Sequence, residues 1–398
     1  MLKYLKVKYA FLFVLLIWLP FQIFVLKADA ASRSILMLMF MTVFVNIANF
    51  NFMKTIIRAP VIFWGLWVIY AFINTILLGL NTGQAYFTFF VYLAGPLMAL
   101  WVMSAESFED RDQLLNIVIA GLYVKLILIF IFEEGRASNL FRLGDKIETN
   151  SIAFSALTLI VFIYLKYVFK GIGLKQLLLL VIFPFFIILL TASRNAFGGF
   201  VILLLSHFYI HRSKRVLHNI AVIFFGAVFI SATFYFIIEN TYLGKRLAET
   251  TEQAQDDLYY YQVKGTILEK FGDRGYFYIL GWDLFKKYPV RGVGVKNFAQ
   301  FQGRYAMHSE YMVQLCELGI IGTLLFILFY GWLGRNLLIT WRSYVDDRKK
   351  TEVFIAVYMI ILFMALSIFQ YNDPVFFLMT GAMTAYIWNK RQQKPETE

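Results

Sequence analysis

The sequence predicts an all-α integral membrane protein with about twelve transmembrane helices and one large helical loop on the outer face. Hydrophobic residues make up 60% of the 398 residues, whereas soluble domains contain about 45–50%. Charged residues make up only 16%, against about 25% in ordinary globular proteins. About 240 apolar residues are enough for twelve spans of about 20 residues, the length that a bilayer core requires. A soluble enzyme, a disordered chain and a fibrous repeat are excluded.

The apolar runs should form helices, because an open strand edge leaves backbone groups unsatisfied in lipid. The predicted spans are residues 9–26, 35–50, 61–80, 86–103, 114–132, 151–169, 176–192, 195–210, 220–238, 311–334, 353–370 and 374–389. The first of them has a second interpretation as a secretory signal peptide, since lysines precede it and Ala28-Asp29-Ala30 follows it. We expect no cleavage, because its apolar run of about 18 residues is long for such a signal.

The orientation of the chain follows from lysine and arginine in the loops, which favour the cytoplasmic side. With the N-terminus inside, the inner segments carry 19 such residues and the short outer segments carry 6. The clusters at 212–215 and 335–350 then lie inside. We therefore expect both termini in the cytoplasm. In a membrane protein, a net charge of +12 more often reflects basic cytoplasmic loops and anionic lipid headgroups than nucleic acid, so the sign of the charge alone decides nothing.

Residues 239–310 break the pattern of short loops, because loops beyond about 12–15 residues are usually functional or disordered. This segment is rich in Tyr, Phe and Leu, and short helices are expected at 253–270 and 275–287. The predicted organisation is a single polytopic membrane domain over residues 1–398, with residues 239–310 as an outer cap within it.

The C-terminal part of this cap is basic. From Leu284 to Ser309 there are five Lys or Arg residues and no acid. Such a patch suits an anionic ligand such as a phosphate, and binding of lipid headgroups is the alternative. The basic residues are Lys286, Lys287, Arg291, Lys296 and Arg304.

His308 is a candidate general base at the end of the cap. It precedes a predicted helix for which Ser309 is the expected N-cap. A helix from Ser309 to Gly334 would be about 39 Å long, so its first turns should protrude from the bilayer or the helix should tilt. The positive helix end disfavours protonation of the imidazole, and a neutral imidazole can accept a proton. A structural hydrogen-bonding role is the alternative.

Arg194 is a candidate anion-binding residue, since it lies between two apolar runs in Ala192-Ser193-Arg194-Asn195. Arginine at a membrane edge is costly and marks a functional site by default. A snorkelling anchor is the alternative. Lys125, in the outer half of its span, is a weaker candidate by the same argument.

Several motifs of other enzyme classes are incomplete. Gly292 to Asn297 begins like a dinucleotide fingerprint, but its sixth position is not glycine and no βαβ pattern precedes it. There is no Walker A lysine, no histidine pair spaced for zinc on the outer face, and only one cysteine, Cys316. We therefore expect no metal and no cofactor.

A longer run of residues resembles the signature of the O-antigen polymerase and O-antigen ligase superfamily. The run consists of Arg274, Trp282, Pro289-Val290-Arg291-Gly292-Val293-Gly294, Phe298, His308-Ser309-Glu310-Tyr311 and Glu317-Leu318-Gly319-Ile320-Ile321-Gly322. The Ser193-Arg194 dipeptide, the twelve spans and the large outer loop between the ninth and tenth also resemble this superfamily. The residue after His308 is Ser, where ligases usually have Asn.

The resemblance implies a metal-independent glycosyltransferase of the GT-C type that uses undecaprenyl-diphosphate-linked sugars at the outer face of the bacterial inner membrane. By resemblance, His308 is the base that deprotonates the acceptor hydroxyl. Arg194 and Arg274 bind the diphosphate, with Arg291 and Arg304 as helpers. Attack from the face opposite the diphosphate predicts inversion at the anomeric carbon. The expected partners are the lipid-linked donor, a glycan acceptor, membrane lipid and a chain-length regulator protein, and no nucleic acid.

Three functions remain open. In a polymerase the acceptor is another lipid-linked repeat unit. In a ligase the same donor passes its glycan to lipid A–core or to a protein. A flippase for lipid-linked oligosaccharides would require charged or broken helices around a central cavity, whereas here the spans carry few charges, chiefly Lys125 and Lys166. The polymerase is the first prediction.

Overall fold

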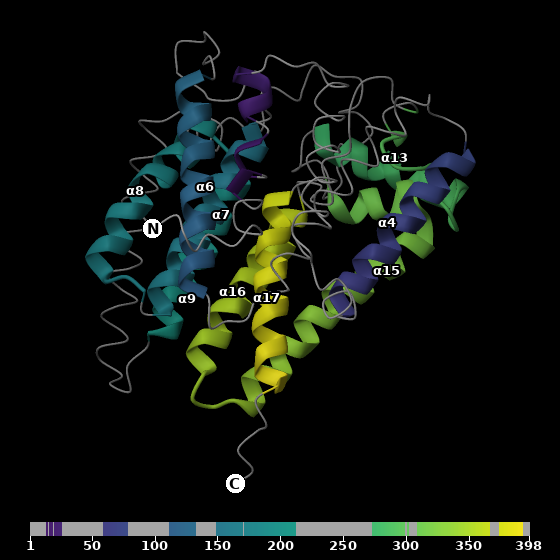
Figure 1. The fold of residues 1–398 in the computed structure, drawn as a ribbon. Coiled ribbons are helices and arrows are strands. Elements are labelled where there is room, and N and C mark those ends of the chain that lie inside the picture. The colour runs from purple at the N-terminus through teal and green to yellow at the C-terminus, as the bar shows by residue number, and fades with distance from the viewer. Residues whose placement is uncertain are drawn as a thin grey trace, which may run out of the picture. The chain divides into compact units, whose positions relative to one another are not determined.

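The computed structural model describes eleven parts of the chain, and every element in them is a helix (Figure 1). The described residues are 13–14, 16–18, 20–25, 59–78, 111–132, 149–169, 171–211, 273–298, 301, 309–366 and 374–392. Five of the described helices are long and apolar enough to cross a membrane, namely α4 (Ala59–Leu78), α6 (Arg111–Phe132), α7 (Thr149–Val168), α8 (Leu174–Thr191) and α15 (Glu310–Ser343). The prediction of a helical membrane protein is confirmed at this level.

The remaining described elements overlap predicted segments. They are η2 (Phe21–Val25), α9 (Arg194–Ile210), α13 (Asp273–Lys287), α16 (Arg348–Ala365) and α17 (Pro374–Gln392). Helix α13 lies in the cap, at the place of the helix expected over 275–287. The predicted spans 35–50, 86–103 and 220–238 and the predicted cap helix 253–270 lie outside the described residues. The total of twelve spans therefore stays a prediction.

The chain forms two compact units, each made of segments that are distant in sequence. The first contains Met1–Ile117, Ala254–Leu337 and Ala365–Glu398, and the second contains Val118–Gln253 and Leu338–Met364. The core of the first unit is aromatic. The Trp64 ring of α4 lies 4.5 Å from the rings of Trp67 and Phe377 and 5.0 Å from that of Phe329. Helices α4, α15 and α17 therefore pack together in this unit.

Helix α7 is the centre of the second unit, because every residue from Ile152 to Leu165 is buried. It packs mainly against α8 and also against α9. Small residues let α9 approach its neighbours, as is common between membrane helices. A Cβ atom on Gly199 would lie 2.6 Å from Leu157 of α7, and one on Gly198 would lie 2.8 Å from Phe363 of α16.

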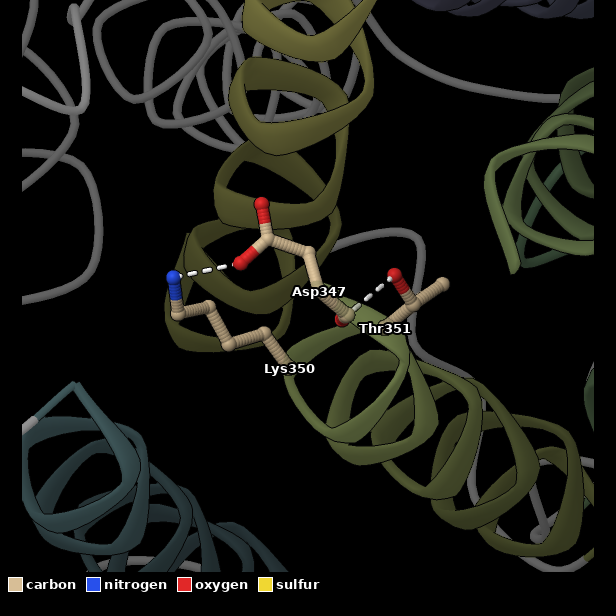
Figure 2. Close-up of polar contacts among 3 residues, drawn as sticks. All are labelled: Asp347, Lys350 and Thr351. Carbon is tan, nitrogen blue, oxygen red and sulfur yellow. Dashed lines mark hydrogen bonds and ion pairs between the residues drawn. The ribbon is translucent and has the colours of Figure 1, made fainter. Parts of the chain in front are cut away.

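The turn between α15 and α16 is held by Asp347 (Figure 2). Its backbone carbonyl accepts hydrogen bonds from the amide of Thr351 at 3.0 Å and from the hydroxyl of Thr351 at 3.2 Å. Its carboxylate pairs with the Lys350 ammonium at 2.5 Å. The Lys350 ammonium also lies 5.8 Å from the centre of the Phe169 ring at the end of α7. These contacts fix the start of α16 in the second unit.

Candidate functional site: a loop docked on a kinked helix

Helix α15 is kinked at Gly319, where φ is 63° and ψ is −162°. The sequence predicts one long helix that protrudes or tilts, so the kink is a difference from the prediction. It turns backbone groups of residues 316 to 321 away from the helix and toward neighbouring segments. The groups that change partner are the carbonyls of Cys316, Glu317 and Leu318 and the amides of Ile320 and Ile321.

The segment Pro289–Phe298, called the 289–298 loop below, satisfies most of these groups. The amides of Val293 and Gly294 donate to the carbonyls of Cys316 and Glu317 at 3.0 and 2.8 Å. In return, the amides of Ile320 and Ile321 donate to the carbonyls of Pro289 and Val290 at 2.8 and 3.5 Å. The Tyr70 hydroxyl of α4 donates to the carbonyl of Leu318 at 3.0 Å. The loop and the kinked helix are thus paired backbone to backbone.

This pairing explains the glycines of the two motifs. A Cβ on Gly319 would lie 2.5 Å from the Val290 carbonyl oxygen, and a Cβ on Gly292 would lie 2.4 Å from the Glu317 carbonyl oxygen. Both glycines also have positive φ, 63° and 68°, a region that disfavours residues with a Cβ atom. The Gly-Val-Gly and Glu-Leu-Gly runs of the sequence therefore have a structural role: they let two backbones touch.

Three buried side chains fasten the loop. The Glu317 carboxylate accepts hydrogen bonds from the amides of Lys296 and Phe298 at 2.8 and 3.4 Å. The Asn74 amide donates to the carbonyl of Arg291 at 2.7 Å. The hydroxyl of Thr75, the next residue of α4, accepts from the amide of Val295 at 3.2 Å. A buried polar group is stabilising only when it is satisfied, so these contacts favour one loop conformation.

All backbone amides of the loop from Gly292 to Phe298 donate to acceptors within the protein. In addition to those already described, Gly292 donates to Tyr288 and Asn297 donates to Gly294. No amide of this stretch is left to cradle a phosphate in the way that glycine-rich nucleotide loops do. An anion at this place must therefore be bound by side chains.

Two cationic side chains project from the docked loop. Arg291 and Lys296 are exposed, while residues 292–295, 297 and 298 are buried. Nearby on α13, the Lys286 ammonium pairs with Asp283 at 2.8 Å. Among the described residues, no ion pair of the Arg291 guanidinium occurs.

The other predicted residues of this unit are less completely described. Arg274 lies in the first turn of α13, and its side chain is not among those described. Arg304 and His308 lie outside the described residues. Ser309 stands directly before α15, and its carbonyl accepts from the Val313 amide at 2.9 Å. Its hydroxyl, however, is buried without a hydrogen-bond partner among the described residues, so the predicted side-chain cap is not made.

Arg194 belongs to the second unit, where it is the first residue of α9 and is exposed. The turn before it is tight, with Ala192 in the left-handed region at φ 51°. The Ser193 hydroxyl accepts from the Ala196 amide at 3.5 Å and contacts the Asn150 side-chain oxygen at 3.3 Å. Arg194 is a cation at the positive N-terminal end of α9, so its charge and the helix dipole repel each other. The arginine and the helix end nevertheless each attract an anion.

A line of buried polar side chains on α15 was missed by the sequence reasoning. The Gln314 amide donates to the Glu310 carboxylate at 2.6 Å, and its oxygen accepts from the Trp67 indole at 2.8 Å. Glu310 and Gln314 are fully buried, and Glu317 continues the same line. The spacing 310, 314, 317 on one face of an apolar helix is the signal that could have found it, since polar groups within a span are costly and usually functional.

No group of three or more His, Cys, Asp or Glu side chains is placed to hold a metal ion among the described residues. Lys125, the weaker candidate, is buried within α6. Lys125 is therefore not exposed at the surface, whereas Arg194 is.

Comparison with known families bears directly on this site. Residues 179–327 match the family described as O-antigen ligase. The match supports an assignment to the O-antigen polymerase and ligase superfamily over these residues. No curated protein matches the chain. The resemblance stated from the sequence is confirmed.

The O-antigen ligase match spans both groups of site residues. It begins in α8 and includes α9 with Arg194, helix α13, the 289–298 loop and the kink of α15. Arg274, Arg304 and His308 also fall within it. Together with the apolar helices, the O-antigen ligase match characterises the chain as a multi-pass membrane protein of a glycan-transferring superfamily. The roles of the individual residues stay predictions.

Proposed function

We propose that the protein is an inverting, metal-independent glycosyltransferase that polymerises undecaprenyl-diphosphate-linked repeat units of a surface polysaccharide such as O-antigen or capsule. The observation that carries the proposal is the docked loop. The 289–298 loop lies within the O-antigen ligase match, is held in place by buried contacts from Asn74, Thr75 and Glu317, and exposes Arg291 and Lys296. Preorganised donors of this kind stabilise the charge that grows on a leaving diphosphate.

The reaction assigned to the site is a single displacement. The acceptor hydroxyl attacks the anomeric carbon as the bond from that carbon to the diphosphate oxygen breaks. The hydroxyl proton passes to His308, and undecaprenyl diphosphate leaves with the bonding electrons. By the family resemblance, Arg194 and Arg274 bind the leaving diphosphate, with Arg291 and Arg304 as helpers. General base catalysis contributes about 10²–10⁴-fold, and each lost anion-stabilising donor costs about 10²–10³-fold in oxyanion sites of comparable design.

We place this site on the outer face of the bacterial inner membrane, with both termini in the cytoplasm. The loop contacts the C-terminal end of α4 and residues 316–321 in the N-terminal half of α15, and all of these belong to the first unit. The distribution of Lys and Arg in the loops predicts that both of these helix ends lie on the outer side. Their contact with one loop of the cap supports the proposed orientation. A chain-length regulator protein is the proposed partner.

The second candidate is a ligase that transfers the same glycan to lipid A–core or to a protein. The description of the matching family as O-antigen ligase favours it. The polymerase and the ligase use the same lipid-linked donor, so only the acceptor distinguishes the two functions.

Product analysis distinguishes these functions. Purified protein in lipid nanodiscs receives a lipid-linked repeat unit, with or without lipid A–core as a second acceptor, and the products are separated by size. A ladder of lipid-linked chains supports the polymerase. A single glycan on lipid A–core supports the ligase. If neither forms, and the donor instead crosses the bilayer of sealed vesicles, the protein is a transporter and the proposal is wrong.

A further inference from the structure

Lys296 has an unusual backbone conformation for a residue with a side chain. Its φ is 59°, and among the described residues only Ala192 shares a positive φ without being glycine. The same loop has glycine at its two other positive-φ positions, Gly292 and Gly294. Glycine would adopt the conformation at 296 without strain. Strained residues persist where surrounding structure holds them, and they concentrate at functional sites.

The surroundings of Lys296 hold it in this conformation. Its amide donates to the Glu317 carboxylate at 2.8 Å. The residues on either side are buried, Val295 at 1% exposure and Asn297 at 0%. The Asn297 side chain donates to the carbonyl of Val293 at 2.8 Å, which closes the turn. The Lys296 side chain is therefore presented to the surface from a turn that is fixed on both sides.

The chemistry around Lys296 points to a dianion as its ligand. Arg291 is exposed at the other end of the same fixed segment, and its carbonyl is held by Asn74. The amides between the two cations are all used within the protein, so the side chains provide the donors. No acidic residue occurs from Leu284 to Ser309. Two cations on one rigid segment suit a phosphate ester better than a single carboxylate.

We propose that Lys296 is a substrate-binding residue, which together with Arg291 binds the diphosphate of the polyprenyl-linked donor. This rests on the proposed function and deepens it, because no motif of the family resemblance includes Lys296. Glu317 acts as its positioning residue, since it holds the Lys296 amide. The same phosphate chemistry occurs in anionic phospholipid headgroups, and we commit to the donor as the ligand.

A structural role for the ammonium makes a different prediction. The Lys296 charge acts on the buried Glu317 carboxylate, and a purely structural lysine would serve only to offset that charge. Removing it would then weaken folding and leave ligand affinity of the folded fraction unchanged. A binding role predicts the reverse, and Lys296→Gly separates the two, because glycine also removes the backbone strain.

The test measures binding of undecaprenyl diphosphate to purified protein in nanodiscs of zwitterionic lipid. Lys296→Gly and Lys296→Gln should each weaken binding about tenfold or more, since a charge-assisted hydrogen bond is lost. Lys296→Arg should stay within about threefold of the wild type, because the charge and a donor remain. Lys349→Gln, which removes an exposed lysine of α16, is the neutral control. The apparent melting temperature of Lys296→Gly should be unchanged or higher.

Several results would overturn the proposal. One is binding by folded Lys296→Gly and Lys296→Gln within about threefold of the wild type. Another is an equal loss of undecaprenyl diphosphate binding in Lys286→Gln, whose lysine is paired with Asp283. The basic residues would then attract the anion through their total charge and not through a specific site. A third is a loss confined to retention on phosphatidylglycerol vesicles, which would make Lys296 a headgroup anchor. Lys296-dependent binding without any glycan transfer by the wild type would keep this site and reject the proposed function.

Discussion

Replacing Gly319 with alanine tests the docking of the loop on the kinked helix. The new Cβ would lie 2.5 Å from both the carbonyl carbon and the carbonyl oxygen of Val290, so the two backbones must separate. The φ of 63° adds a left-handed penalty of about 1–2 kcal/mol. The hydrogen bonds from Ile320 and Ile321 to the loop are lost or lengthened, at about 0.5–1.5 kcal/mol each. The expected destabilisation is therefore about 2–5 kcal/mol.

Gly331 provides a matched control in the same helix. A Cβ on Gly331 meets nothing within 4 Å, and alanine in a helix interior is favoured over glycine by about 0.5–1 kcal/mol. The assay is the apparent melting temperature in detergent, combined with hydrogen exchange of the amides of Val293 and Gly294. Gly319→Ala should melt lower and exchange these amides faster, while Gly331→Ala should do neither. Equal behaviour of the two variants would refute the docking argument.

Three further substitutions probe the same account. Glu317→Gln should leave the amide of Phe298 or its neighbour without an acceptor, at about 1–3 kcal/mol, and lower the melting temperature; an unchanged value would mean that the carboxylate does not fasten the loop. Asn74→Ala should remove the hydrogen bond to the Arg291 carbonyl, at a cost of about 1 kcal/mol, and raise KM for the donor more than it lowers kcat. A fall in kcat with unchanged KM would mean that this contact does not position a donor-binding residue. Arg194→Lys should lower kcat/KM at least about tenfold, because lysine cannot reproduce a bidentate fork; wild-type turnover would reject diphosphate contact by Arg194.

The spans were predictable because hydrocarbon thickness sets the length of an apolar run. Helices α7, α8 and α9 begin and end within a few residues of the predicted bounds, including the very short turn before Arg194. The cap helix over 275–287 was found for a similar reason, from its composition. In these places local sequence determines local structure.

The kink and the loop contacts were not predictable, because they depend on residues far apart in sequence. Helix α15 contains several glycines, and the close contact with Val290 and the positive φ distinguish Gly319 from Gly331. Glu317 resembles any acid near a helix end until its partners at 296 and 298 are placed. Ser309 has the right residue type for a cap, yet its hydroxyl is buried without a partner among the described residues. Tertiary contacts override local preference in each case.

The central claim is glycan transfer from a polyprenyl diphosphate by a base at position 308. The most direct measurement is the release of undecaprenyl diphosphate when purified protein meets its lipid-linked glycan donor and acceptor in the presence of a chelator. Wild-type protein should release it in step with formation of the new glycosidic bond, and folded His308→Ala should release it at least about 10²-fold more slowly. Transfer by His308→Ala at the wild-type rate, or a wild-type protein that transfers nothing, would contradict the account.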